Sequence, residues 1–380
     1  MSEGSSWAVV FGGPSPEHEI SILTGLQAER VLARAGHAVT PLYWAPTGGW
    51  FVVPSATEAK DYLNGAPSGA RPVEVRVGAD GGLFVKGRLR SERLTIDAAL
   101  TCLHGGIGEG GGFAALFALL GIPTTGSTMY ASALGMDKLA FGGVMEVAGV
   151  PTLPRVALEA DVEPPFAGPY IVKPRFGGSS IGIEIVDDIV TARVLGRTSA
   201  HLRGGAVVEP FRGDLVDLNI SFRTAPTLEV SDLERPLRRP DGAVYSYDEK
   251  YLGGSGEAAG LASAPREMPA QVPDEVTALA GTLARRVAAV TRLTGVVRVD
   301  FLYDPTSHEL VVNEVNSVPG AMALYLWASR RDAAQVLVDA LVEARDAPPV
   351  SAPSGFGSGA ALRAAGGIAG KLVGLDGPRG

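Results

Sequence analysis

Cysteine is almost absent from this sequence: Cys102 is the one cysteine among 380 residues, which excludes an intrachain disulfide and a zinc site built from cysteines. No run of eighteen apolar residues and no apolar N-terminal signal occurs. Acidic residues outnumber basic ones, 41 to 33, and the net charge of -8 argues against recognition of nucleic acid through a broad basic surface. We therefore expect a cytoplasmic protein without nucleic-acid or membrane partners.

Lysine is also scarce, because six of the 33 basic residues are Lys and the rest are Arg. Three of the six, Lys138, Lys173 and Lys250, lie inside the motifs described below. Hydrophobic residues make up 46% of the chain, which is ample for a packed core, and the length is sufficient for two or three domains. The composition predicts a folded, globular protein.

Two units of strand, glycine turn and helix indicate that residues 1–126 form an N-terminal α/β domain with a doubly wound parallel sheet. The first unit has a strand at 7–11 and a helix that runs to about Arg34. The second has a strand at 96–103, a glycine-rich turn and a helix at 113–120.

Two α+β units and a tail are expected to follow. The central unit covers 127–208 and the C-terminal unit covers 209–347. The segment 348–380 is rich in Ala, Gly, Ser and Pro, which predicts a flexible tail. The expected helices of these parts are 138–148, 273–292, 332–345 and, frayed, 360–373.

Two alternating segments, 296–303 and 310–320, flank turn residues and are predicted to form a hairpin. Alternation places Arg298 and Asp300 on one face of the first strand. It places Glu314 on one face of the second, together with Asn316. If the turn centres on Ser307, Asp300 then lies opposite Glu314.

This face of the hairpin offers oxygen ligands beside a guanidinium. Asp, Glu and Asn oxygens suit a hard cation such as Mg2+, and Arg298, expected opposite Asn316, suits phosphate or a developing oxyanion. The alternative is a solvated face of an amphipathic hairpin, which is common in antiparallel sheets.

Residues 173–182 form a glycine- and serine-rich turn between two expected strands, with Lys173 at the end of the first. Small residues let backbone N–H groups converge on phosphate oxygens, and Lys supplies a point charge. An ordinary hairpin turn is the alternative. No Walker A pattern occurs, and the turn after Gly12 lacks the later glycines of a dinucleotide fingerprint.

The insert at 227–265 is too long and too polar for an idle connection in a compact domain. It contains an aromatic, charged cluster at 245–252, followed by a glycine hinge at 253–256. These features favour a closing lid, with a disordered surface loop as the alternative.

Several charged residues at the two glycine turns have more than one interpretation. Glu17 and Glu19 open the first helix, where carboxylates can simply complement the helix dipole. His104 and Glu109 are similarly ambiguous. The histidines without the spacing of a metal site are expected to be structural or exposed, namely His18, His37, His201 and His308.

Taken in order, these segments resemble the D-alanine–D-alanine ligases of the ATP-grasp superfamily. The resemblance covers residues 7 to about 345, and the combination of motifs is specific although each motif alone is weak. The matching segments are Gly12–Ser21, Leu103–Glu109, Gly126–Ser127, Ser132–Lys138, Val172–Pro174, Gly178–Gly182, Tyr247–Leu252, Arg298–Asp300, Asn313–Asn316 and Pro319–Gly320.

The resemblance implies an ATP-grasp fold, in which two α+β domains clamp ATP beside the N-terminal domain. It implies that ATP phosphorylates the carboxylate of a first amino acid, and that the amine of a second attacks the acyl phosphate to give an amide, ADP and phosphate. Two Mg2+ ions, with Mn2+ as a substitute, would neutralise the phosphates. A homodimer is also expected.

Residue roles follow from the same resemblance. The metal ligands are Asp300, Glu314 and Asn316. The nucleotide-binding residues are Lys138, Lys173, Ser179, Ser180, Glu209, Phe211, Arg212, Asp217 and Lys250. The residues at the reacting groups are Glu17 for the first substrate's ammonium, Ser179 and Tyr251 linking it to the lid, and Arg298 with the Gly320 N–H for the oxyanion.

Three positions depart from the family pattern. Tyr325 and Leu326 stand where a Ser-Leu pair usually lines the second-substrate pocket, and a Tyr fills much of that space. Gly110 replaces a usual Asp. The ribose-binding carboxylate has no clean counterpart, and Asp217 is favoured over Asp214.

The sequence therefore predicts an ATP-dependent ligase that joins two small-molecule amino acids, in cell-wall or specialised metabolism. A relative making another dipeptide or amide is the first alternative. The second is a nucleotide-binding regulator that lost the chemistry, against which the retained charged ligands argue, because such charges are costly to bury unpaired. The identity and stereochemistry of both amino acids stay open.

Overall fold

The computed structural model describes residues 6–78, 80–87, 90–237, 265–348, 358–364, 368 and 372. Internal packing divides the chain into Met1–Ala347 and Pro348–Gly380. In the second unit the described helix is α10 (Ala360–Ala364), inside the segment where a frayed helix was expected. No helix in the described part of the chain is long and apolar enough to cross a membrane.

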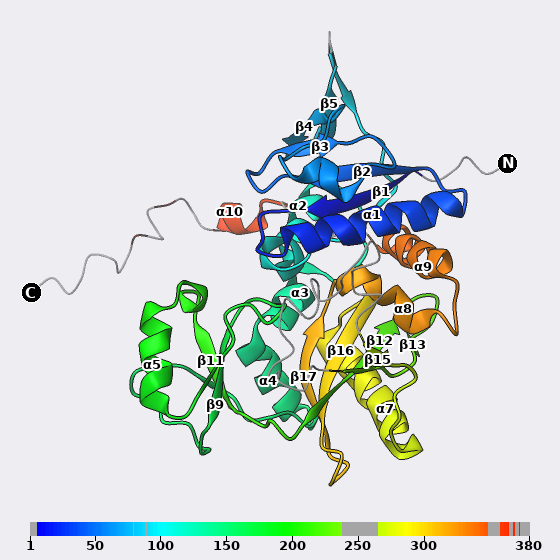
Figure 1. Cartoon of the computed structure of the whole chain (residues 1–380). Coiled ribbons are helices and arrows are strands. Elements are labelled where there is room, and N and C mark those ends of the chain that lie inside the picture. The colour runs from blue at the N-terminus through cyan, green and yellow to red at the C-terminus, as the bar shows by residue number, and fades with distance from the viewer. Residues whose placement is uncertain are drawn as a thin grey trace, which may run out of the picture. The chain divides into compact units, whose positions relative to one another are not determined.

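The first sheet has the strand order β6-β5-β4-β3-β2-β1-β7, and its parallel part is confined to β2, β1 and β7 (Figure 1). These strands are β1 (Trp7–Gly12), β2 (Val39–Trp44) and β7 (Ala98–Thr101). An antiparallel extension that the sequence did not reveal consists of β3 (Trp50–Val52), β4 (Arg71–Arg76), β5 (Gly82–Lys86) and β6 (Ser91–Arg93).

Helices cover both faces of the parallel strands, as a doubly wound sheet requires. On one face Val9 and Phe11 pack in one core with α1 (His18–Arg34) and α9 (Ala333–Asp346). On the other face the neighbouring residues of β1 pack against α2 (Phe113–Leu120). The helix that ends the first unit thus completes the core of the first sheet.

The second sheet has the order β10-β9-β11-β8, and α5 packs against it. The glycine- and serine-rich turn at 173–182, here called the glycine loop, connects β9 to β10, so Lys173 lies near its start. The elements of this part are α3 (Met129–Met136), α4 (Lys138–Val147), β8 (Val156–Ala157), β9 (Tyr170–Pro174), β10 (Glu184–Val186), α5 (Ile189–Thr198) and β11 (Ala206–Pro210).

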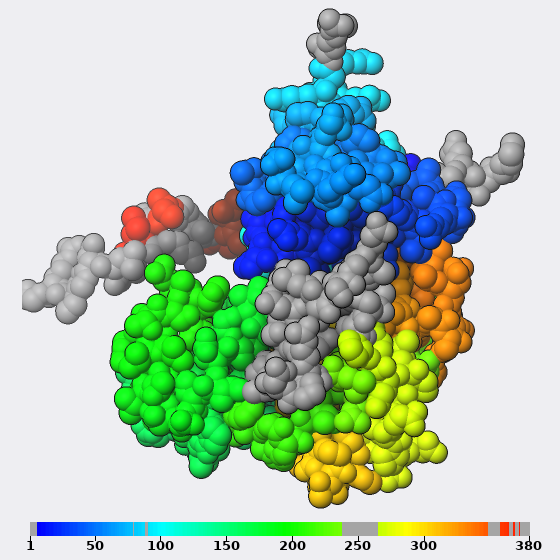
Figure 2. Space-filling model, viewed as in Figure 1, coloured from blue at the N-terminus to red at the C-terminus, as the bar shows by residue number. Residues whose placement is uncertain are grey.

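The third sheet has the order β13-β12-β16-β17, and α7 covers its apolar face. The elements are β12 (Val216–Arg223), β13 (Glu229–Val230), α7 (Asp274–Thr291), β16 (Val296–Tyr303) and β17 (Leu310–Asn316). In Figure 2 the green atoms of the second sheet and the yellow atoms of α7 occupy opposite sides of the lower part of this view. The antiparallel pair of β16 and β17 is the hairpin expected from the sequence.

The beginning of the segment expected to be a lid is tied to the third sheet. β13 pairs with β12, and β14 (Arg235–Pro236) pairs with β15 (Arg266–Glu267) across the insert. Residues 238–264, including Lys250 and Tyr251, lie outside the described residues. The remaining short helical turns are η1 (Ala59–Tyr62), η2 (Gly108–Gly112), η3 (Ala200–Leu202), η5 (Gly320–Ala323) and α8 (Leu324–Trp327).

Candidate active site

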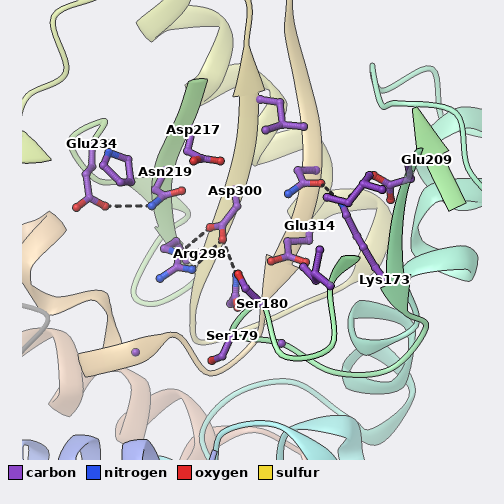
Figure 3. A pocket seen from close by; sticks show the side chains of 18 of the residues that line it. Lys173, Ser179, Ser180, Glu209, Asp217, Asn219, Glu234, Arg298, Asp300 and Glu314 are labelled. Carbon is purple, nitrogen blue, oxygen red and sulfur yellow. Dashed lines mark hydrogen bonds and ion pairs between the residues drawn. The ribbon is translucent and has the colours of Figure 1, made fainter. Parts of the chain in front are cut away.

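One cavity gathers most of the residues singled out in the sequence (Figure 3). Its walls come from the second and third sheets, from the glycine loop, and from the two turns that precede α1 and α2. The expected site residues that line it are Glu17, Lys173, Ser179, Ser180, Glu209, Phe211, Arg212, Asp217, Arg298, Asp300, Glu314, Asn316, Gly320 and Tyr325. Leu326 is instead fully buried in the core beneath the first sheet.

The polar residues of the hairpin face one another as expected for a turn centred on Ser307. Asp300 pairs with Glu314, and Arg298 pairs with Asn316. Arg298 donates to both carboxylate oxygens of Asp300, at 2.6 and 2.8 Å, and the Asn316 amide donates to the same carboxylate at 3.0 Å. The polar face of the hairpin is therefore a wall of the cavity.

A bulge between Asp300 and Phe301 shifts this register by one residue. Asn313 is the extra residue on the second strand, and it faces the cavity next to Glu314. Its side-chain oxygen accepts a hydrogen bond from Lys173 at 3.2 Å. Bulges re-aim side chains in this way beside functional sites.

The donor set fits a divalent cation shared with phosphate. Asp300 and Glu314 are two carboxylates directly opposite one another, with the amide of Asn316 adjacent. Among the described residues no three His, Cys, Asp or Glu side chains form a metal cage. Mg2+ is commonly held by one or two carboxylates plus substrate phosphates, so this smaller set suits it.

Lys173 lines the cavity from the second sheet, whereas Lys138, the first residue of α4, pairs with the lining residue Glu314 without lining the cavity itself. Lys173 donates to Glu209 at 2.7 Å and is 6% exposed. Lys138 lies 3.5 Å from Glu314 and donates to the Gly177 carbonyl in the glycine loop. Each lysine is thus fixed beside an acidic group at the cavity before any phosphate enters.

Glu209 is fully buried between two cations. Burial alone would raise the pKa of its carboxyl, but Lys173 and Arg155 lower it below its usual value. Arg155 lies 3.5 Å from Glu209 and was not identified in the sequence. Only the fold brings it there, because it belongs to the segment before β8.

The glycine loop contacts the start of α1. Ser179 donates a hydrogen bond to Glu17, and both Ser179 and Ser180 have left-handed backbones, with φ of 53° and 59°. Residues held in this region tend to cluster at functional sites. Glu17 directly precedes α1 and is buried, at 7% exposure.

Glu109 and His104, which the sequence left open, also line the cavity. Glu109 accepts hydrogen bonds from the backbone N–H groups of Gly105, at 2.9 Å, and Val318, at 3.1 Å. Burial, reinforced by nearby Glu17, raises the pKa of Glu109 to about 7. Burial lowers the pKa of His104 to about 4, so its ring is neutral at pH 7.

His18, by contrast, has a structural position. Its Nδ1 lies 2.7 Å from the Gly13 carbonyl, and its Nε2 lies 3.2 Å from the Tyr43 hydroxyl. Through His18, these contacts link the glycine turn at Gly13 to Tyr43 on β2.

The two candidate ribose carboxylates lie in different surroundings. Asp217 lines the cavity on β12, opposite Leu302. Asp214 does not line the cavity, and it accepts a hydrogen bond at 2.8 Å from the lining residue Arg212. Only Asp217 is therefore in a position to contact a molecule in the cavity.

The segment after Pro319 makes a left-handed turn. Ala321, Met322 and Ala323 have φ of 51°, 51° and 49°. The turn is held by the Ala321 N–H, which donates to Thr24 at 3.2 Å, and by burial of Met322 and Ala323 in the core. It carries Gly320 and Tyr325 to the cavity.

Sequence reasoning missed three residues at one end of the cavity, Asn219, Glu234 and Arg266. Asn219 could have been found, because it alternates with Asp217 along the polar face of β12. Glu234 lies inside the insert and Arg266 directly follows it, and no periodic pattern marks either residue.

Comparisons with known proteins agree along almost the whole first unit. The family models described as D-ala D-ala ligase N-terminus and C-terminus match residues 6–127 and 135–344. The D-alanine--D-alanine ligases of Synechococcus sp. and Methylobacterium sp. are each 30% identical to this chain. The alignments cover 88% and 89% of this chain and 96% and 89% of those proteins.

The fold has solved counterparts. The VanG D-Ala:D-Ser ligase from Enterococcus faecalis superposes with a TM-score of 0.71 at 22% identity, over 90% of this chain and 99% of that one. Such structures have the ATP-grasp fold, and this chain shares it.

Proposed function

Because the chain belongs to the D-alanine–D-alanine ligase family and is an ATP-dependent ligase, we propose that the described cavity activates one amino acid as an acyl phosphate and joins it to an amine. D-alanine is the proposed first substrate, since the curated relatives are named for it. The observation that carries the proposal is the meeting of Glu17, Ser179 and the Asp300–Glu314 pair in one cavity.

The nucleotide would bind between the second and third sheets. Lys138 and Lys173 offer positive charge to its phosphates, with Ser180 beside them in the glycine loop. Asp217 is proposed for the ribose. The segment from Glu209 through Phe211 to Arg212 is proposed for the adenine.

Two Mg2+ ions, or Mn2+ in their place, are proposed to bind to Asp300, Glu314 and Asn316. They would neutralise phosphate charge during phosphoryl transfer. The chain's own task is to hold these ligands in register, which the β16–β17 pairing does.

Glu17 is proposed to bind the ammonium of the first substrate, because it is a buried carboxylate at the edge of the cavity. Arg298 and the Gly320 N–H are proposed to stabilise the tetrahedral oxyanion. Lys250 and Tyr251 are proposed to complete the site from the lid, and Tyr325 to bound the second substrate, with Leu326 packed behind it. We further propose three domains, at 1–126, 127–208 and 209–347, followed by a tail. We also propose that the protein is a cytoplasmic homodimer.

The test traps the acyl phosphate. The protein is incubated with ATP, Mg2+ and hydroxylamine, with D-alanine, D-serine, glycine and each L-amino acid in turn, and hydroxamate and ADP are measured. We expect both products in equal amounts with at least one amino acid. ATP binding without any hydroxamate would refute the proposal and favour a nucleotide-binding regulator.

A pair of variants tests the metal assignment in the same assay. Glu314→Ala removes a proposed ligand, and we expect hydroxamate formation to fall by about a thousandfold. Glu309→Ala removes an exposed carboxylate from the turn of the same hairpin and should leave the rate unchanged. Equal rates in the two variants would contradict the assignment.

A further inference from the structure

A group of four side chains, here called the Glu234 cluster, closes one end of the cavity and has no role in the nucleotide, metal or first-substrate assignments. It consists of Asn219, Glu234, Arg266 and Tyr325. Figure 3 shows Glu234 and Asn219 on the far side of Arg298 and Asp300 from Lys173 and Glu209.

Three donors of the cluster converge on one carboxylate. The Tyr325 hydroxyl donates to Glu234 at 3.0 Å, and the Asn219 amide donates to it at 3.2 Å. The Arg266 guanidinium lies 3.1 Å from the other oxygen of Glu234 and 4.5 Å from the centre of the Tyr325 ring. Glu234 itself is 3% exposed.

The position of the cluster makes it the wall of the second-substrate subsite, an assignment that rests on the proposed function. Tyr325 follows the left-handed turn that begins at Gly320, a proposed oxyanion donor. An amine that attacks the acyl carbon must come from a side not occupied by ATP, metal or first substrate. The end of the cavity next to Arg298 and the Glu234 cluster is that side.

The chemistry of this wall disfavours a substrate carboxylate. A carboxylate needs donors, yet the Tyr325 hydroxyl has one proton and gives it to Glu234. The Asn219 amide and Arg266 also point donors at Glu234. The charge of Arg266 is already balanced by Glu234, so a second carboxylate here would have to compete with Glu234 for these donors.

We propose that the second substrate is an amine without a free carboxylate on the neighbouring carbon, with an amino-acid amide as the chemical type. Glu234 takes the place that a substrate carboxylate would otherwise fill. In the reaction the amine nitrogen bonds to the acyl carbon, the bond from that carbon to the phosphate oxygen breaks, and phosphate leaves with the electron pair. The amine proton passes to solvent or phosphate.

The test compares two second substrates that differ in this group alone, alanine and alaninamide, each as both stereoisomers. The first substrate is the amino acid that gives hydroxamate, and kcat/KM is measured for each second substrate. We expect the wild type to favour the amide at least tenfold. In Glu234→Gln, which removes the charge, the amide-to-acid ratio should fall at least tenfold, and Glu234→Ala should act in the same direction.

Glu267→Gln is the charge-matched control, because Glu267 pairs with Arg235 on the neighbouring ribbon and does not line the cavity. Its ratio should equal that of the wild type. Comparing ratios between variants cancels the different basicities of the two amines. A tenfold preference of the wild type for alanine, or one ratio shared by all variants, would overturn the proposal.

The hydroxamate assay distinguishes a failure of this inference from a failure of the proposed ligase function. Hydroxylamine replaces the second substrate, so hydroxamate formation does not depend on the Glu234 cluster. Hydroxamate together with a preference for free alanine would refute the inference and leave the ligase intact. No hydroxamate from any amino acid would refute both.

Discussion

At the residue scale, the buried charges of the cavity hold one another in place. Lys173, Glu209 and Arg155 are nearly enclosed, and Glu209 lies between the two cations. Removing one partner from such a group leaves an uncompensated charge, which typically costs about 3–5 kcal/mol. The pairing therefore holds Lys173 in a fixed position at the cavity, where a phosphate would meet its positive charge.

Gly105 offers a way to move Glu17 without mutating it. A Cβ at Gly105 would lie 2.1 Å from the Glu17 carboxylate, so Gly105→Ala must displace that group. We expect KM for the first amino acid to rise at least tenfold, because Glu17 is the proposed ammonium ligand. Steady-state kinetics with varied first substrate measures this.

Gly121→Ala is the matched control. Gly121 has nearly the same backbone angle as Gly105, φ of +67° against +63°, but a Cβ there meets nothing within 4 Å. Both variants carry the backbone strain, and only Gly105→Ala disturbs Glu17. An equal, small effect on KM in both would exclude Glu17 from first-substrate binding.

Glu109 predicts a pH dependence of stability. Its pKa in the folded state is raised to about 7, from an ordinary value near 4.5, first by burial and then by Glu17. The stabilisation that the protonated carboxyl contributes is complete below pH 4.5 and is lost as the pH rises through 7. Between pH 5 and 8 the free energy of unfolding should fall by about 2–3 kcal/mol through this group.

Urea unfolding of the wild type and Glu109→Gln at several pH values isolates the contribution of Glu109 to the free energy of unfolding, because the Gln side chain does not titrate. The difference between the two proteins should shift in favour of the variant as pH rises from 5 to 8. A difference that stays constant across this range would mean that Glu109 is ionised throughout.

At the element scale, the left-handed turn at η5 stores backbone strain next to the site. An Ala in this region costs about 1–2 kcal/mol, whereas Gly adopts it freely but loses more entropy on folding. Ala321→Gly should therefore leave the free energy of unfolding unchanged or raise it by up to about 1 kcal/mol. Ala278→Gly, in an exposed part of α7, should lower it by about 1 kcal/mol.

Chemical denaturation of both variants makes the comparison. If Ala321→Gly loses as much stability as Ala278→Gly, the turn is not strained, and its conformation would then need no support from Thr24 and the core.

Elements with a strong period were predictable, and those set by distant partners were not. The alternation of β16 and β17 gave the faces on which Asp300 and Glu314 lie, because a strand places every second residue on one face, whereas their pairing was expected only for a turn centred on Ser307. The bulge at Asn313 breaks that period by one residue, and nothing in the local sequence marks it. The strands β3 and β6 have three residues each, which is too short for an alternating pattern to stand out.

At the scale of the whole molecule, the site depends on contacts between segments far apart in the chain. The Val318 N–H donates to Glu109, and Ser179 donates to Glu17, across separations of 209 and 162 residues. The sequence could name most of these residues by type and motif. Their meeting, and the place of Arg266 above Tyr325, depended on packing that no local pattern records.

The division of the chain predicts which truncation is tolerated. Residues Met1–Ala347 form one compact unit, and α9 near its end buries Val336, Leu337 and Leu341 against the first sheet. Deleting 348–380 should change Tm by no more than about 2 °C, whereas a chain ending at 332 should fail to fold. Thermal unfolding by circular dichroism, with a hydroxamate assay, compares the two; a shorter chain that still folds would contradict the assigned role of α9.

The central claim is that a carboxylate oxygen of the first substrate attacks the terminal phosphorus of ATP within this cavity. Labelling both carboxylate oxygens of the first substrate with ¹⁸O and analysing the released phosphate by mass spectrometry tests it directly. Acyl-phosphate chemistry predicts one ¹⁸O atom in each phosphate and one retained in the amide. Unlabelled phosphate, with ATP consumed and amide formed, would contradict it.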